Sequence, residues 1–563
     1  MKIASAADLE TARQAGLQKI LPGKPRIAVG LATCGIAVGG NRVYERLREI
    51  IETKKLDIIL TKTGCIGYCR EEPLVNISIP GKPLVILHKV TEGDAEEIIR
   101  QAKEGTVPER KALCRIASWD HVTGCTLEYG KGFTKIPLYE QVPFFKGQKK
   151  VILRDAGLIN PEDIDEYIAV GGYAAATKAL TRMDPEAIIT EVEKSGLRGR
   201  GGAGFPTGLK WRITRDAKAD KKYIICNADE GDPGAYMNRN EMESDPHMLI
   251  ESMIIGAFAM GAAEGLIYIR AEYPLAIKRL KLAIVQARKY GLLGRNILST
   301  GFSFDIGIAT GAGAFVCGES TALIASIEGR IGRPHPRPPR LTDIGGGLFG
   351  YPTDLNNVET WCNIPVIIMN GSEWYARIGA KDNTGTKVFS LVGKVDRVGL
   401  VEVPLGTTLN TIVSDIGNGG ANGRKVKAVQ TGGPSGGCIP VRLFDTPVDF
   451  ENLNKAGSIM GSGGIVVMDE DTDMVDIARY FINFATNESC GKCIPCREGL
   501  KHSLLLLNRI MAGKGTKKDI ETLALLSETI VATSLCGLGQ TAPNPVLTTL
   551  TYFREEYDAL VKP

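Results

Sequence analysis

The segment Ser489-Cys490-Gly491-Lys492-Cys493-Ile494-Pro495-Cys496-Arg497-Glu498-Gly499 places three thiols at C-x2-C-x2-C spacing, and Cys536 follows 40 residues after Cys496. Three close cysteines and one remote cysteine are typical of a cubane iron–sulfur cluster, in which each corner iron takes one soft thiolate ligand. A structural zinc site also accepts four cysteines, but such sites more often show two separated C-x2-C pairs. The spacing therefore favours a [4Fe–4S] cluster and one-electron chemistry.

Length, charge and cysteine content narrow the class of protein. A chain of 563 residues is too long for one hydrophobic core, so three or four domains are expected. The net charge of +4 gives no reason to expect nucleic acid or an anionic membrane surface as a partner. Thirteen cysteines, an odd number scattered through a long chain, argue against a disulfide framework and favour a reducing, cytoplasmic compartment.

The hydrophobic pattern predicts neither a secretory signal nor a membrane span. Residues 1–24 mix charges with alanines, as an amphipathic helix does, and have no apolar central run. The longest apolar candidate, residues 248–270, contains Glu251 and Glu264 and is interrupted by glycines. This stretch predicts a buried helix that runs into a strand, and we expect a soluble protein.

The pattern along the chain predicts an α/β multidomain fold with five regions. Residues 1–104 alternate β-rich runs at 27–29, 56–60, 74–78 and 84–87 with helical stretches, which predicts a small α/β domain. The next regions are expected to be a linker with a helical segment (105–182), a glycine-rich α/β domain (183–384), a mostly β domain (385–468) and a helical region (469–563).

A second informative stretch is Arg198-Gly199-Arg200-Gly201-Gly202-Ala203-Gly204-Phe205-Pro206-Thr207-Gly208-Leu209-Lys210-Trp211. Glycines at this density let backbone N–H groups approach a phosphate or a flat ring, and Arg200 and Lys210 supply positive charge nearby. Residues 185–194 are helical in pattern, so no strand precedes the loop and an ordinary Rossmann motif is not predicted. The alternative is a flexible glycine linker, against which the large apolar Phe205 and Trp211 argue.

Three further stretches fit a nucleotide or flavin pocket. Residues 227–232 (Asn-Ala-Asp-Glu-Gly-Asp) follow the predicted strand at Tyr223, and ligands bind at this end of strands in open α/β sheets. Residues 311–323 follow another predicted strand and begin a helix, which offers free N–H donors to an anion. Asn356 and Asn357 add two side-chain amides that can bond ring or ribose oxygens.

Taken together, these motifs resemble the flavin-bearing, NADH-oxidising subunit of the complex I family. The same module occurs in NAD-reducing hydrogenases, NAD-dependent formate dehydrogenases and electron-bifurcating complexes. The resemblance covers about residues 145 to 560 and rests on five motifs in the same order. They are the glycine-rich stretch, Asn-Ala-Asp-Glu, Gly-Ala-Gly-Ala-Phe-Val-Cys-Gly-Glu, Asn-Asn-Val-Glu-Thr and Ser-Cys-Gly-x-Cys-x-Pro-Cys-Arg-Glu-Gly.

The resemblance implies a Rossmann-like domain that binds FMN and NAD(H), a ubiquitin-like β-grasp domain at 385–468 and a C-terminal helical bundle. In this bundle, Cys490, Cys493, Cys496 and Cys536 would hold the [4Fe–4S] cluster. The expected chemistry is hydride transfer between nicotinamide and flavin, followed by one-electron transfer to the cluster. It needs no catalytic side chain beyond FMN, because the flavin carries the reaction.

The resemblance also implies a set of cofactor-binding residues, in which Phe205 stacks on the NAD adenine. They are Gly199, Arg200, Gly201, Gly202, Phe205, Lys210, Asn227, Asp229, Glu230, Asp232, Phe315, Gly318, Glu319, Ser320, Asn356 and Asn357. The implied partners are a small thioredoxin-like [2Fe–2S] subunit and a terminal oxidoreductase subunit in a hetero-oligomer. A non-enzymatic alternative is an iron–sulfur scaffold whose flavin site has decayed.

The chain departs from the family pattern near the flavin and the adenine. Ser320 stands where the family often has a second acidic residue, and losing a carboxylate there should raise the flavin potential. Ile213 and Arg340 stand at other positions around the adenine, and Arg340 could stack on it or meet an extra phosphate. NAD rather than NADP therefore follows from the family alone. Residues 333–340 otherwise have the composition of a stiff, basic polyproline loop.

The N-terminal domain resembles a thioredoxin-like [2Fe–2S] ferredoxin with one ligand missing. Cys34, Cys65 and Cys69 match its second, third and fourth ligands, whereas Val29 stands at the first. Because a two-iron cluster needs four ligands, we expect this domain to keep its fold without a stable [2Fe–2S] cluster. The three thiols would then be small buried hydrophobic groups, and the domain would serve docking. The alternative is that the cluster takes a fourth ligand from Cys114, a histidine or a partner chain.

Overall fold

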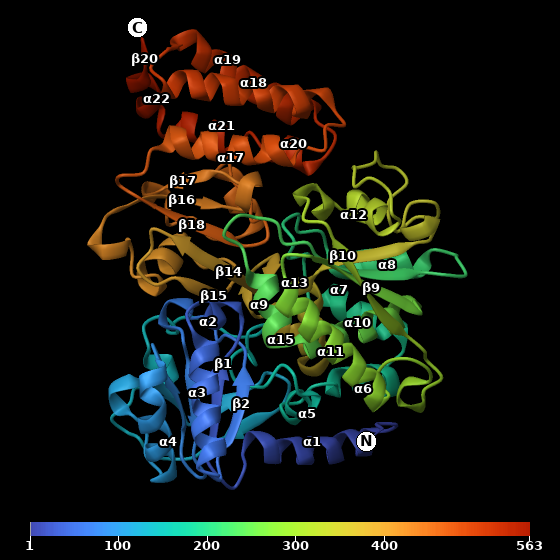
Figure 1. Cartoon of the computed structure of the whole chain (residues 1–563). Helices are drawn as coiled ribbons and strands as arrows, with labels where there is room; N and C mark the ends of the chain where they lie inside the picture. The colour runs from blue at the N-terminus through green and yellow to red at the C-terminus, as the bar shows by residue number, and fades with distance from the viewer. Residues whose placement is uncertain (1, 563) are drawn as a thin grey trace.

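The structure is a computed structural model that describes residues 2–562. The N-terminal sheet and the C-terminal helices lie at opposite ends of the molecule, with the four-stranded sheet and the other five-stranded sheet between them (Figure 1). Within the described residues, no helix has the length and apolar character needed to cross a membrane.

The N-terminal domain is built on a five-stranded mixed sheet in the order β2-β1-β3-β4-β5. β1 is parallel to β2, whereas β1 with β3, β3 with β4 and β4 with β5 are antiparallel. The elements are α1 (Ala6–Ile20), β1 (Arg26–Gly30), α2 (Thr33–Ala37), α3 (Gly40–Thr53), β2 (Ile59–Thr63), β3 (Val75–Ser78), β4 (Leu84–Leu87), α4 (Ala95–Lys103) and β5 (Ala112–Ile116).

Two boundaries in this domain differ from the sequence expectation. The run expected at 56–60 becomes a strand only at Ile59, because Lys54 and Lys55 first close the end of α3 and Lys55 has a positive φ of 47°. β5 lies beyond residue 104 but pairs with β4, so part of the expected linker completes the sheet.

The connection to the next domain contains a hairpin and two helices: β6 (Ser118–Asp120), β7 (Thr126–Glu128), α5 (Ile164–Ala169) and α6 (Ala174–Arg182). α1 packs against α5, and a Cβ on Gly16 would lie 2.1 Å from the Asp165 carbonyl oxygen, so only glycine fits this contact. Lys19 Nζ bonds Asp165 Oδ2 at 2.7 Å. The N-terminal helix is thereby fixed to the connection.

The central domain has a four-stranded, wholly parallel sheet in the order β10-β9-β8-β11. Its strands are β8 (Tyr223–Ala228), β9 (Glu264–Arg270), β10 (Asp305–Gly311) and β11 (Thr353–Asn357). Its helices are α7 (Pro185–Lys194), α8 (Thr207–Asp216), α9 (Met237–Ser244), α10 (Pro246–Met260), α11 (Pro274–Tyr290), α12 (Ser320–Ile327), α13 (Val358–Cys362), α14 (Ile364–Asn370) and α15 (Ser372–Ala376). The apolar run predicted as a helix continuing into a strand is α10 followed by β9.

The next domain has a mixed sheet in the order β15-β14-β18-β16-β17. Its elements are β14 (Thr386–Gly393), β15 (Gly399–Pro404), β16 (Val426–Thr431), β17 (Cys438–Pro440), α16 (Phe450–Lys455) and β18 (Gly464–Asp469). A fully buried ion pair between Lys387 on β14 and Glu359 on α13 joins this sheet to the central domain. Glu402 on β15 accepts the N–H groups of residues 151–153 and so fixes the earlier connection as well.

The C-terminal region is helical and lies next to the sheet β15-β14-β18-β16-β17, whose domain is called the second sheet domain below (Figure 1). It contains α17 (Met474–Glu488), α18 (Ile494–Met511), α19 (Lys517–Thr533), α20 (Gly537–Thr541), α21 (Asn544–Tyr552) and α22 (Arg554–Leu560). α17, α18 and α19 pack side by side around a separate apolar core, as the helical periodicity predicted.

Candidate functional site

The glycine-rich stretch is an ordered loop between α7 and α8. Gly199 N bonds Phe205 O and Thr207 N bonds Leu197 O, both at 2.9 Å, so the loop closes on itself. Gly202 and Gly204 have φ of 116° and 63°, a region that favours glycine. A flexible linker is therefore excluded, and the glycines serve a fixed turn.

Arg200 points away from the loop's open side. Its buried guanidinium donates to the carbonyl oxygens of Arg198, Thr384 and Thr386 at 2.8, 2.6 and 3.1 Å, and to the Tyr375 hydroxyl at 3.1 Å. The expectation that its side chain adds positive charge to a ligand site is therefore wrong. Arg200 instead ties the loop to the start of β14.

Lys210 supplies the positive charge at the site. Its Nζ donates to Leu355 O at 2.6 Å and to Asn356 Oδ1 at 2.7 Å, so it lies at the carboxyl end of β11. Burial lowers the pKa of this ammonium from its ordinary value. An anionic ligand would offset that cost.

Asn227 and the polar residues that follow β8 lie at the same edge of the sheet, because β8 runs parallel to β11 and Asn227 pairs with Asn357. Asn227 donates from Nδ2 to Gly318 O at 2.9 Å and accepts Asp229 N at 3.0 Å. Burial raises the pKa of the Asp229 carboxyl to about 7, although the Arg270 guanidinium at 3.6 Å opposes the shift. Asp229 Oδ2 is buried and has no hydrogen-bond partner among residues 2–562. Such an orphan acceptor is what a bound donor would satisfy.

Glu230 and Asp232 hold neighbouring elements in place. Glu230 accepts Asn238 N and Arg239 N, both at 3.0 Å, and thereby fixes the start of α9. Asp232 accepts the Ser462 hydroxyl at 2.5 Å from the second sheet domain. Burial raises the pKa of Asp232 to about 6.

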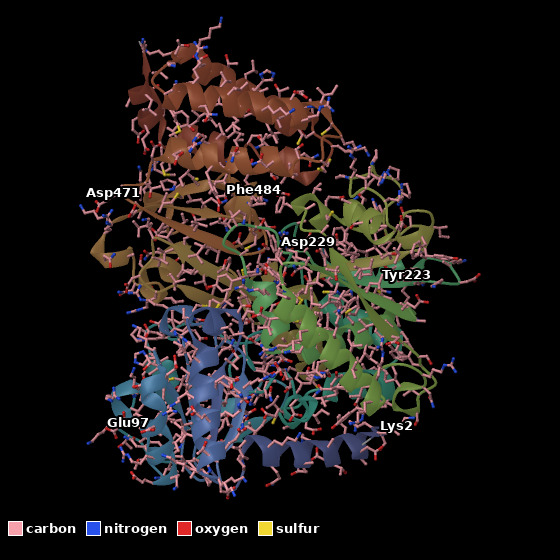
Figure 2. All side chains as sticks on the ribbon, in the orientation of Figure 1. Lys2, Glu97, Tyr223, Asp229, Asp471 and Phe484 are labelled. Carbon is pink, nitrogen blue, oxygen red and sulfur yellow. The ribbon has the colours of Figure 1, made fainter. Side chains whose placement is uncertain are left out.

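The segment before α12 connects this edge to the C-terminal helices. Glu319 accepts the N–H groups of Thr321 and Ala322 at 2.9 and 3.0 Å, and its other oxygen accepts from Arg337 at 2.7 Å. Phe315 donates its N–H to a carboxylate on α17 at 2.8 Å, and its ring meets Phe484 edge-on at 5.4 Å. Figure 2 shows Asp229 and Phe484 close to this junction.

These residues surround two adjoining cavities of about 760 and 500 Å³, which share the wall formed by Gly201, Ala203, Asn227 and Asn357. Of the sixteen residues predicted to bind cofactors, all except Arg200 line one or both cavities. A Cβ on Gly201 would lie 3.2 Å from Asn357 Cβ, so the glycine keeps the shared wall open. The cavities and the orphan Asp229 oxygen fit a flat, polar cofactor.

Ile213 and Arg340, which the sequence places around the adenine, both line the larger cavity. Several other lining residues are not predicted from the sequence. Arg337 and Pro338 also line the larger cavity, so the basic polyproline loop is part of its wall. The residues 459–462 and 537–538 line the smaller one. Among these, only the Gly461-Ser462-Gly463-Gly464 run carries a local signal, namely its glycine density.

The four cysteines of the C-terminal motif lie at helix starts. Cys490 and Cys493 precede α18, Cys496 is in its first turn, and Cys536 immediately precedes α20. Burial raises the pKa of the Cys496 thiol to about 11, and repulsion from the other three thiols adds to the shift. Four soft ligands at these helix starts fit an iron–sulfur cluster. Gly537 and Leu538, directly after Cys536, line the smaller cavity.

The N-terminal cysteines also converge. The Sγ atoms of Cys34, Cys65 and Cys69 all lie within 4.8 Å of one another, whereas Val29 packs in the apolar core of the domain. Cys65 is fully buried, but Cys34 and Cys69 are only partly so. The sequence predicts that all three thiols are small buried hydrophobic groups, but full burial is found only for Cys65.

Comparison with known proteins agrees with these features. The family described as the Nuo51 FMN-binding domain matches residues 192–366, and the NADH-ubiquinone oxidoreductase-F iron-sulfur binding region matches residues 476–560. The chain is 55% identical over 416 residues to the NADP-reducing hydrogenase subunit HndC of Solidesulfovibrio fructosivorans, covering 74% of this chain and 84% of that protein. It is 44% identical to an NADH-quinone oxidoreductase subunit of Rhizobium meliloti (strain 1021), covering 73% and 97%.

A solved structure matches the whole chain. The crystal structure of an NAD+-reducing [NiFe]-hydrogenase in the air-oxidized state superposes with a TM-score of 0.65 at 28% identity, covering 100% of this chain and 94% of that one. The glycine loop, the parallel sheet and the cysteine motif lie inside the matched regions. The chain therefore belongs to the family of NADH-oxidising, FMN-binding and 4Fe-4S-containing subunits of complex I and of NAD(P)-reducing hydrogenases.

Proposed function

We propose that the two adjoining cavities hold FMN and NAD(H), and that Cys490, Cys493, Cys496 and Cys536 hold the [4Fe–4S] cluster. FMN, when bound, supplies hydride exchange with NADH and the passage of single electrons to the cluster. One observation carries this proposal. The smaller cavity is lined both by the polar edge of the parallel sheet and by Gly537 and Leu538, directly after Cys536.

The chain's own residues would position the ligands. The backbone of the glycine loop and the ammonium of Lys210 are donors suited to an anionic phosphate. Asn227, Asn357 and Asp229 offer amide and carboxyl groups around the shared wall. Phe205, with 46% of its surface exposed, lines the larger cavity and presents a ring to the adenine.

The strand orders support the finer names of the domains. A β2-β1-β3-β4 core with one parallel pair supports a thioredoxin-like domain, here extended by β5. The all-parallel sheet supports a Rossmann-like FMN/NAD domain, and the order β15-β14-β18-β16-β17 supports a ubiquitin-like β-grasp domain. The proposed domain plan is 1–104, 105–182, 183–384, 385–468 and 469–563, with the first sheet taking one strand from the second segment.

We infer that the protein works in a cytoplasmic hetero-oligomer. Both relatives described above are, by name, subunits of larger enzymes. We propose a small thioredoxin-like [2Fe–2S] subunit and a terminal oxidoreductase subunit as partners. Electron bifurcation, formate oxidation and hydrogen oxidation are alternative reactions for the terminal partner.

The test measures acid-released FMN and NADH–ferricyanide activity in the purified protein. We expect about one FMN per chain and bleaching of the flavin absorbance by NADH. Gly201→Val should lower the flavin content, because the added side chain projects toward Asn357 across the shared wall. Gly23→Val is the matched control, since a Cβ there has open space around it. A brown protein that contains iron but no flavin would instead support the scaffold alternative.

A further inference from the structure

We propose that the N-terminal domain binds a single divalent metal ion of the zinc class, held by Cys34, Cys65, Cys69 and Glu72. This site takes the place that the two-iron cluster has in the ferredoxins that the domain resembles. It is independent of the flavin site and of the cluster at the C-terminal motif.

The spacing of the three thiols suits one tetrahedral ion. Cys69 Sγ lies 3.4 Å from Cys34 Sγ and 3.9 Å from Cys65 Sγ. Zinc–sulfur bonds of about 2.3 Å give a tetrahedral sulfur–sulfur edge of about 3.8 Å. The distance from Cys69 Sγ to Cys34 Sγ is shorter than this value, and the distance to Cys65 Sγ is slightly longer.

The same spacing does not fit a two-iron cluster. Its four ligands divide between two irons, so a thiolate on one iron is separated from the thiolates on the other by the cluster itself. Here all three thiols lie within 4.8 Å of one another, with no pair set apart. The position of the missing ligand is also closed, because Val29 is fully buried in the apolar core.

Glu72 lies on the side from which the missing ligand would come. A Cβ on Gly30, the residue after Val29, would lie 3.1 Å from Glu72 Oε2, and a Cβ on Gly35, the residue after Cys34, would lie 3.0 Å from it. The carboxylate therefore lies against both backbone segments. The set of ligand atoms that lie within 4.8 Å of one another contains the three thiols alone, so Glu72 would complete the site by turning toward them. Carboxylate oxygen is an ordinary fourth ligand of zinc.

Glu72 also lacks the partners that a buried carboxylate needs. It is 6% exposed, and Oε2 accepts Leu74 N at 2.8 Å. Oε1 has no hydrogen-bond partner within the described part of the chain, residues 2–562. Leaving a buried charged group partly unpaired is costly, and a cation held by the neighbouring thiolates would satisfy it.

The charges around the group balance for a divalent ion. Three thiolates and one carboxylate leave two negative charges beside such an ion. Arg239 Nη2 lies 4.0 Å from Cys34 Sγ, and the buried ammonium of Lys150 lies 3.5 Å from the position of a Cβ on Gly67. Lys150 Nζ has no hydrogen-bond partner among residues 2–562. These two cations supply the compensating positive charge.

The site lies where the N-terminal domain meets α9 of the central domain. The Tyr236 hydroxyl lies 3.5 Å from Cys69 Sγ, and Cys65 N donates to the Ser244 hydroxyl at 3.1 Å. Thr33, next to Cys34, donates its N–H to Glu243 at 2.8 Å. A metal ion here would fasten the two loops that carry the cysteines and hold them against α9, so its role is structural.

The experiment measures metals in the full-length purified protein. We expect about four irons and about one zinc per chain by mass spectrometry of metals. Zinc X-ray absorption should show about three sulfur neighbours at about 2.3 Å and one oxygen at about 2.0 Å. Cys65→Ser should lose most of the zinc and keep its iron and flavin. Glu72→Gln should release zinc faster to a chelator, while Cys114→Ala, a buried cysteine outside the group, should keep it.

Three results would overturn the proposal. About six irons per chain with a two-iron EPR signal lost in Cys65→Ser would show a [2Fe–2S] cluster. About four irons without zinc, with the three thiols free to alkylation, would show a metal-free group. Zinc retained by both Cys65→Ser and the more exposed Cys34→Ser would place the metal elsewhere; Cys34→Ser also decides the case if Cys65→Ser fails to fold.

Discussion

Phe205→Ala should weaken NADH binding without changing flavin content. Phe205 lines the larger cavity but not the smaller one, and its ring makes few contacts that folding needs, because 46% of its surface is exposed. Truncation to alanine should therefore leave the fold and the flavin in place. Its main effect should be the loss of a stacking surface for the adenine.

The expected size follows from stacking energies. A base stacked on an aromatic side chain gains about 1–3 kcal/mol. This energy corresponds to an increase of about 5- to 150-fold in the Kd for NADH. Phe205→Trp keeps a flat ring at the same place, so it should retain most of the affinity.

The assay is titration of NADH into the oxidised protein, followed by steady-state reduction of ferricyanide. Tyr480→Ala is the matched control, because Tyr480 is 51% exposed on α17 and lines neither cavity. An unchanged Kd in Phe205→Ala, with flavin content and melting temperature intact, would refute the placement of the adenine. A loss of flavin in the same variant would refute the assumption that the ring is dispensable for the fold.

Three more substitutions test the cluster, the buried carboxyl and the domain junction. Cys493→Ser should remove about four irons per chain by iron analysis while ferricyanide reduction by NADH persists, and a surviving four-iron EPR signal would contradict the ligand assignment. The pKa of Asp229 is raised from 3.8 to about 7, so the protonated carboxyl stabilises the fold fully below pH 4, and this stabilisation is lost as the pH rises through 7. In flavin-free protein, Asp229→Asn should therefore make the melting temperature depend less on pH over this window. A curve of melting temperature against pH that is parallel to that of the unchanged protein would contradict this prediction. Glu359→Gln leaves the Lys387 ammonium buried without a counterion and should cost about 3–5 kcal/mol in urea unfolding, whereas Asp558→Asn, in an exposed pair, should cost under about 1 kcal/mol; equal losses would contradict the argument.

Local patterns predict elements that depend on near neighbours. The helix expected at 185–194 is α7, and the apolar run from 248 onward is α10 followed by β9. Side-chain periodicity and glycine breaks decide such elements within a few residues. The same periodicity explains why the element directly before the glycine loop is predictable as a helix.

Features set by distant partners are not predictable in this way. β5 joins the first sheet through pairing with β4, and nothing within the segment itself shows that partner. The Arg200 side chain turns toward Thr384, 184 positions along the chain. The sequence therefore shows that an arginine is present in the loop, but it does not show where the guanidinium points. The convergence of Cys34 with Cys65 likewise depends on the tertiary fold. Motif spacing indicates the candidate residues, and packing determines where they point.

The smaller cavity has walls from three separate parts of the chain: Asp229 from the central domain, Met460 from the second sheet domain, and Leu538 from the C-terminal helices. A ligand there contacts surfaces that must already be assembled, so it binds the native state and not the unfolded chain. Each tenfold excess of free ligand over its Kd then adds about 1.4 kcal/mol against unfolding. Heating or limited proteolysis that separates any one wall would release the ligand, and riboflavin starvation of the producing cell should yield a chain that proteases cleave more readily at these junctions.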